Sequence, residues 1–157
     1  MFRSLESVKK TIEDMATGKA DEAMKGEFVS YDDDARELVM RFPVLDWELN
    51  SKDVVHGMVT CGWLDTVMGA LSNDVDHEVF APTGSMYVNF ITAVPEKENV
   101  LVSARVLTHG KRLIRLRAEA RIESSGQLAA DTEGVYIPVT YRPSDAMKAQ
   151  EAHSSAV

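Results

Sequence analysis

The chain has 157 residues, and 45% of them are hydrophobic, a share that is ordinary for a globular protein. This length predicts one domain with a sizeable core. The formal net charge of −8 argues against general nucleic-acid binding, so an anionic ligand would need a local basic patch. One cysteine permits no internal disulfide, and no run approaches a membrane span or a signal-peptide core, so we expect a cytoplasmic protein.

The N-terminal segment is predicted to be helical. Ser4 can cap a first helix, and Gly18 would end it. Asp21 can cap a short second turn that closes at Gly26. The apolar positions of the first helix keep a spacing of three or four: Leu5, Val8, Ile12 and Met15. Its polar face is mixed in sign, which favours packing over membrane anchoring, and we predict that residues 1–30 form a helical cover.

The next segment predicts extended structure. Residues 28–31 form a short extended piece, and the three aspartates at 32–34 form a turn, because they lack the spacing of calcium ligands. Residues 37–45 alternate, which predicts a strand whose end or exposed edge is marked by Pro43. One face of this strand is apolar: Leu38, Met40, Phe42 and Val44. Residues 46–55 then form a loop.

A central helix is predicted over about residues 57–71, because the stretch is apolar on most sides of a helical wheel. Its apolar positions are Met58, Cys61, Trp63, Leu64, Val67, Met68, Ala70 and Leu71. A helix of this kind belongs in a core, wrapped by other elements. Residues 73–83 follow as a loop that can border a cleft.

Four strands with short turns are predicted after this loop: residues 85–94, 100–109, 111–123 and 127–139. In the third of them, apolar residues alternate with Arg and Glu, which is typical of a one-sided antiparallel sheet. Residues 142–157 read as a polar tail. One helix followed by these strands predicts an α+β fold, in which a curved antiparallel sheet wraps the buried helix.

The position of Asp65, a charged residue on the apolar side of the predicted central helix, requires an explanation. It lies inside the apolar arc and is too far along the helix to be its N-cap. Burying an ionised carboxylate without partners is very costly. Asp65 is therefore either a structural carboxylate held by an arginine or backbone donors, or a catalytic acid in a substrate cleft.

Polar groups gather just before the helix. Asn50 lies in a polar run, and His56-Gly57 opens the helix, where unpaired N–H groups can receive a developing negative charge. Two helical turns separate Gly57 from Asp65, about 12 Å of rise. One small substrate group can reach both only if the first turn is irregular or a second chain contributes.

These residues resemble a known pattern. Asn50, His56-Gly57 and then Asp65, nine residues after the histidine, are similar to the hotdog-fold acyl-CoA thioesterases of the phenylacetate-degradation type. Further similar segments follow in the same order: residues 84–90 with Pro95, residues 106–113 and residues 126–130. The resemblance covers roughly residues 36–140. One departure is Met58, which stands where the family usually has a second glycine.

The resemblance implies a hotdog domain over residues 31–141 that hydrolyses acyl-CoA thioesters. Asp65 would be the general base or the nucleophile, and the Gly57 N–H would receive the oxyanion. Asn50 would hold the water or the carbonyl, and His56 would orient the Asn50 loop. For Asn50 and His56, the alternatives are a plain loop residue and a structural histidine.

The resemblance also implies a substrate-binding surface and an assembly. Ser85 would hydrogen-bond the carboxylate or a water, unless it is a strand-start serine with no role, and Met58 would narrow the acyl pocket. Lys111 and Arg112 would bind the phosphates of CoA, unless they belong to a solvated strand face. The site would be shared across a homodimer or a dimer-of-dimers tetramer, with no metal and no cofactor.

Two other functions compete. A hotdog dehydratase would need a histidine five residues after an aspartate, or an acid at residue 70, and the chain has neither. A non-catalytic acyl-CoA binding or sensing protein would not need the combination of Asn50, Gly57 and Asp65. The sequence leaves the acyl group open.

Overall fold

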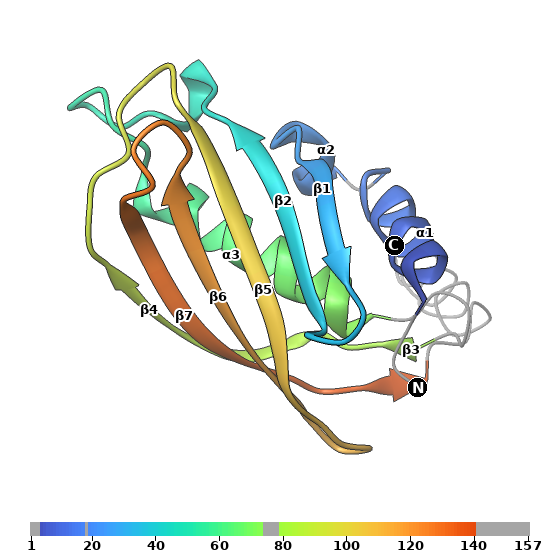
Figure 1. The fold of residues 1–157 in the computed structure, drawn as a ribbon. Coiled ribbons are helices and arrows are strands. Elements are labelled where there is room, and N and C mark those ends of the chain that lie inside the picture. The colour runs from blue at the N-terminus through green and yellow to red at the C-terminus, as the bar shows by residue number, and fades with distance from the viewer. Residues whose placement is uncertain (1–3, 18, 74–78, 141–157) are drawn as a thin grey trace, which may run out of the picture.

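A curved antiparallel sheet wraps one central helix in the computed structural model, which describes residues 4–17, 19–73 and 79–140 (Figure 1). The strand order is β1-β2-β5-β6-β7-β4. The strands are β1 Glu27–Asp32, β2 Glu37–Pro43, β4 Thr83–Phe90, β5 Asn99–His109, β6 Ile114–Ile122 and β7 Leu128–Tyr136. The central helix, α3, spans Gly57–Ser72. The α+β arrangement predicted from the sequence is confirmed.

The strands differ from the prediction at their ends. β4 stops at Phe90, four residues early, and the chain then turns into a loop. The predicted last strand is interrupted before Pro138, which has no N–H to give to a ladder. Its end forms β8 (Val139–Thr140), which pairs with β3 (Val79–Phe80) in a separate two-stranded sheet. Two-residue strands carry no periodic signal, so the sequence predicted only a loop at β3.

The core lies between α3 and the inner face of the sheet. All five inward residues predicted for β6 are buried: Ile114, Leu116, Ala118, Ala120 and Ile122. Met68 packs on the backbone of β7 at Gly134, where a Cβ would lie 3.2 Å from the Met68 Cε atom. Trp63 is fully buried and stacks on Phe42 of β2, with ring centroids 5.8 Å apart. These contacts fix the rotation of α3 on the sheet.

One side of α3 is not covered by the sheet. Met58 is 66% exposed, and Cys61 and Asp65 are half-buried. The prediction that Met58, Cys61 and Asp65 lie on a core-facing side of the helix is wrong, because the sheet covers the opposite side. Burial and then the nearby Asp65 raise the pKa of the Cys61 thiol. Asp65 thus lies at the border of the core.

The N-terminal helices α1 (Leu5–Met15) and α2 (Lys19–Ala23) pack beside α3 and β1 (Figure 1). Ser4 caps α1 as predicted, by accepting a hydrogen bond from the Ser7 N–H. Gly18, the predicted stop, lies outside the described residues, as do residues 142–157 of the predicted tail. Asp21 lies inside α2 and does not cap it.

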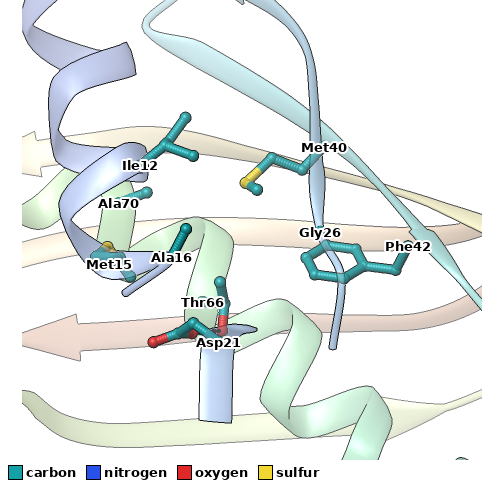
Figure 2. Close-up of a pocket in the computed structure, with 9 residues that line it drawn as sticks. All are labelled: Ile12, Met15, Ala16, Asp21, Gly26, Met40, Phe42, Thr66 and Ala70. Carbon is teal, nitrogen blue, oxygen red and sulfur yellow. Dashed lines mark hydrogen bonds between the residues drawn. The ribbon is translucent and has the colours of Figure 1, made fainter. Parts of the chain in front are cut away.

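Figure 2 shows the seam between this cover and the core. The Thr66 hydroxyl of α3 donates a hydrogen bond to Asp21 of α2, and Met40 and Phe42 of β2 face Ile12 across the seam. The seam encloses about 20 Å³, enough for one water molecule. None of the helices in the described segments is both long and apolar enough to cross a bilayer.

Candidate active site

The loop before α3 is anchored by a buried carboxyl group. Glu48, in the short 3-10 helix η1 (Asp46–Glu48), is completely buried, and its Oε2 atom accepts a hydrogen bond from the Leu45 N–H at 2.8 Å. The Glu48 carbonyl accepts a hydrogen bond from the His56 N–H. Burial raises the pKa of the Glu48 carboxyl. This residue therefore joins both ends of the loop that carries Asn50.

Asn50 shapes the tip of this loop. Its Oδ1 atom accepts a hydrogen bond from the Lys52 N–H at 2.8 Å, which closes a tight turn, and its own N–H donates to the Val54 carbonyl. Within the described residues, its side-chain NH₂ group has no protein acceptor. Asn50 is thus a turn residue that keeps a free pair of donors.

His56 caps α3 in a way that leaves one backbone donor free. Its Nδ1 atom accepts a hydrogen bond from the Met58 N–H at 3.1 Å. This bond requires Nδ1 to be unprotonated and leaves any ring proton on Nε2. The N–H of Gly57, the first residue of the helix, has no acceptor among the described residues. A free N–H at a helix N-terminus is a ready donor for an anionic oxygen.

A pocket of about 300 Å³ adjoins this donor. Its walls come from the start of α3, the end of β4 and the loop that follows: Val55, Gly57, Thr60, Phe90, Ile91, Thr92, Ala93, Val94 and Ala129. The Phe90 ring lies close over Gly57, where a Cβ would meet the ring at 3.3 Å. The glycine therefore keeps the space between ring and backbone open.

Asp65 is held by two hydroxyl groups. Thr83 of β4 donates to its Oδ1 atom at 2.7 Å, and Tyr136 of β7 donates to the same atom at 2.6 Å. The Oδ2 atom has no protein donor among the described residues, and no Arg or Lys of this part of the chain forms an ion pair with the carboxylate. The alternative that an arginine holds Asp65 as a purely structural carboxylate is therefore not found among the described residues.

The donor Tyr136 is rigidly placed. It is 1% exposed, and burial, followed by the charge of Asp65, raises the pKa of its phenol well above the usual range. The hydroxyl therefore stays protonated and keeps donating. One oxygen of Asp65 is thus fixed in place while the other remains available.

The two halves of the site lie apart within one chain. Asp65 is two helical turns from Gly57, about 12 Å of rise. Thr83 and Phe90, at the two ends of β4, mark these two places. β4 is an edge strand of the six-stranded sheet, with Tyr87 75% exposed and Phe90 59% exposed.

Ser85 and Met58, the two residues predicted to contact the substrate, are both exposed at the surface of the described chain. Ser85 is exposed on β4, whereas the hydroxyl on Asp65 belongs to Thr83, two residues earlier. Met58 is exposed in the first turn of α3, next to Gly57.

The predicted CoA-binding residues, Lys111 and Arg112, do not lie at the Gly57 end of the sheet. Lys111 and Arg112 are exposed in the turn between β5 and β6. Figure 1 shows this turn at its lower end, away from the start of α3. Because Ile114 lies across from Tyr136, this turn is at the Asp65 end of the sheet. The strand arginines after it are paired, for example Arg115 with Glu133 at 3.0 Å. In the described part of the chain, no ion pair involves Lys111 or Arg112.

Sequence reasoning missed Thr83 and Tyr136. They lie 18 and 71 positions after Asp65 in the chain, so only the pairing of β4 with β7 beside α3 brings them to the carboxylate. No local motif marks either residue. Across the described ranges, no group of three or more His, Cys, Asp or Glu residues is arranged to hold a metal ion.

Comparison with known families and structures identifies one matching family and several structures of similar fold. The thioesterase superfamily profile matches residues 52–129, which include Gly57 and Asp65. No protein with a curated function matches the chain.

Solved structures resemble the chain at low identity. The PaaI protein from the phenylacetic acid degradation operon of E. coli is 17% identical, with a TM-score of 0.75, over 85% of this chain and 94% of that one. Zebra fish thioesterase superfamily member 2 is 20% identical, with a TM-score of 0.74, over 86% and 98%. Protein smu.793 of Streptococcus mutans, bound to acetyl CoA, is 17% identical, with a TM-score of 0.66, over 75% and 91%. At these identities the likeness shows a shared fold.

Proposed function

Because the chain belongs to the thioesterase superfamily and has the hotdog fold, we propose that it hydrolyses acyl-CoA thioesters to a free acid and CoA. One observation carries the proposal. Asp65 is a carboxylate with one oxygen held by two hydroxyl donors, the other oxygen free, and no cationic partner among the described residues. The acetyl CoA bound to the similar Streptococcus mutans protein supports the substrate class.

In the proposed reaction, Asp65 acts on the thioester carbonyl in one of two ways. As a general base, its free oxygen takes a proton from water, the water oxygen bonds to the carbonyl carbon, and the C–S bond then breaks. As a nucleophile, the same oxygen bonds to that carbon and water then hydrolyses the anhydride. In both cases CoA leaves as a thiolate that takes up a proton.

The oxyanion would be received at the start of α3. The Gly57 N–H is a free donor because His56 occupies the next N–H, so we assign the oxyanion to Gly57. The free NH₂ group of Asn50 is suited to hold the carbonyl oxygen or the water, since its Oδ1 atom is engaged in the turn. His56 then serves as a positioning residue and not as a proton carrier.

The separation of Asp65 and Gly57 argues for a site shared by two chains. The free edge of β4 runs between them and exposes Tyr87 and Phe90, and the exposed Ile91 follows directly after the strand. Antiparallel pairing of β4 with a second copy would bring the Asp65 end of one chain to the Gly57 end of the other. A dimer, or a tetramer built of two dimers, would complete two sites.

The remaining sequence-based roles stay part of the proposal. Lys111 and Arg112 would bind CoA phosphates from the Asp65 end of the sheet, Ser85 would contact substrate along β4, and Met58 would narrow the mouth of the pocket. A cytoplasmic location is expected because the single cysteine permits no internal disulfide.

The test measures the turnover of a panel of aryl and aliphatic acyl-CoAs by detecting the CoA thiol that is released. The Kd of each compound is measured by calorimetry. We expect hydrolysis of at least one member with ordinary saturation kinetics. Tight binding of acyl-CoA without any turnover would contradict the proposal and identify a sensor instead.

Subunit sharing has its own experiment. Heterodimers are assembled from one subunit carrying Asp65→Ala and one carrying Gly57→Pro, each inactive alone. A shared site predicts that one of the two sites in each heterodimer is intact, so about half of the wild-type activity returns. Heterodimers as inactive as the parents would place both groups in the same subunit's site.

A further inference from the structure

The pocket beside Gly57 is apolar except for two hydroxyl side chains, those of Thr60 and Thr92. Thr60 is three residues after Gly57, so both project from the same face of α3. Thr60 is only 5% exposed, yet it lines the pocket. A hydroxyl-bearing side chain therefore lines the space that adjoins the oxyanion donor.

Within the described residues, this hydroxyl has no protein partner. Other buried hydroxyls on helices bond back to a carbonyl: Thr11 to Ser7 and Ser72 to Gly69. Thr60 makes no such bond. Its oxygen is not completely enclosed, and the side chain that carries it lines the pocket.

We infer that Thr60 selects acyl groups that carry a hydroxyl or oxo substituent close to the thioester. This inference rests on the proposed function, because it places the thioester carbonyl at the Gly57 N–H. Positions three apart on a helix are neighbours on one face, about 5–6 Å apart, so we expect the substituent within a few carbons of the thioester carbonyl. A hydroxyl both donates and accepts, so it can pair with either substituent.

An unsubstituted acyl chain that fills the pocket would shield the Thr60 hydroxyl from water without offering it a hydrogen-bond partner. Leaving a buried polar group unpaired is costly, and sites built to bond a polar substituent discriminate strongly against analogues that lack it. A pocket of about 300 Å³ is at the small end for ligand sites, which also disfavours long acyl chains.

The test compares kcat/KM for 3-hydroxybutyryl-CoA and butyryl-CoA. We expect the wild type to favour the hydroxylated substrate about tenfold or more. Thr60→Val keeps the shape and removes the hydroxyl, so it should bring the ratio close to one, while Thr60→Ser should keep the preference. Thr66→Val is the matched control on α3, because the Thr66 hydroxyl bonds Asp21 outside this pocket.

Each outcome separates this inference from the proposed function. Equal turnover of the two substrates, or a ratio that Thr60→Val does not change, overturns the role of Thr60 and leaves the thioesterase proposal intact. If neither substrate is hydrolysed, the wider acyl-CoA panel decides the proposed function, and the Kd ratio of the two compounds on wild type and Thr60→Val still decides the inference. Thermal unfolding shows that each variant is folded.

Discussion

Replacing Gly57 by proline removes the proposed oxyanion donor and adds side-chain atoms beside the Phe90 ring. Proline has no N–H, and it is well tolerated at the first position of a helix, which is where Gly57 lies. His56 has φ −66° and ψ 135°, the extended conformation that a residue before proline prefers. The hydrogen bond from the Met58 N–H to His56 does not involve the replaced group.

The expected loss is large for catalysis and small for the fold. Removing one oxyanion donor lowers kcat about 100- to 1,000-fold, which is about 3–4 kcal/mol of transition-state stabilisation. Gly57→Ala is the matched control, because it adds a Cβ and keeps the N–H. That Cβ would meet the Phe90 ring at 3.3 Å, and this ring is 59% exposed and can move aside.

Steady-state kinetics on both variants, with circular dichroism and thermal unfolding, make the comparison. We expect Gly57→Ala to keep kcat within about tenfold of wild type and Gly57→Pro to fall far below it. Equal kcat for the two variants, both folded, would refute the assignment of the oxyanion to this N–H.

Three further changes test the surroundings of the site. Tyr136→Phe removes a buried donor from the Asp65 carboxylate and should cost about 1.5–3 kcal/mol in urea unfolding; a loss within about 0.5 kcal/mol, the size expected of an ordinary surface change, would contradict the reasoning. Burial raises the pKa of Glu48, so the native state holds that proton more tightly than the unfolded state. The stability of the wild type should therefore fall relative to that of Glu48→Gln as pH rises above about 4.3. Parallel curves of unfolding free energy against pH for the two proteins would contradict this. Asn50→Asp keeps the acceptor of the turn and loses the NH₂ donors, so turnover should fall as far as in Asn50→Ala, and wild-type turnover would reduce Asn50 to a loop residue.

The elements that sequence predicted well are those with a long, regular pattern. β6 buries the face that its alternation indicated, and α3 lies in the core as its apolar pattern indicated except along the stripe of Met58, Cys61 and Asp65. The early end of β4 and the pair β3–β8 were missed. Two-residue strands and a strand end depend on neighbours that no local pattern reports.

The candidate site was predictable only in part. His56-Gly57 at the start of a helix is a local signal, and its cap geometry follows from neighbouring residues. The partners of Asp65 are not local: Thr83 and Tyr136 meet it only after β4 and β7 pair beside α3. The stripe of α3 that carries Asp65 was also placed too deep, since a helical wheel shows where residues cluster but not which arc the sheet leaves uncovered.

The role of Asp65 is tested most directly by kcat of Asp65→Asn on the best acyl-CoA substrate. The amide keeps an oxygen that can accept from Thr83 and Tyr136, so the variant should fold and bind acyl-CoA. Loss of the base or nucleophile predicts a fall in kcat of about 1,000-fold or more. A folded Asp65→Asn variant that turns over within a few fold of wild type would contradict the account.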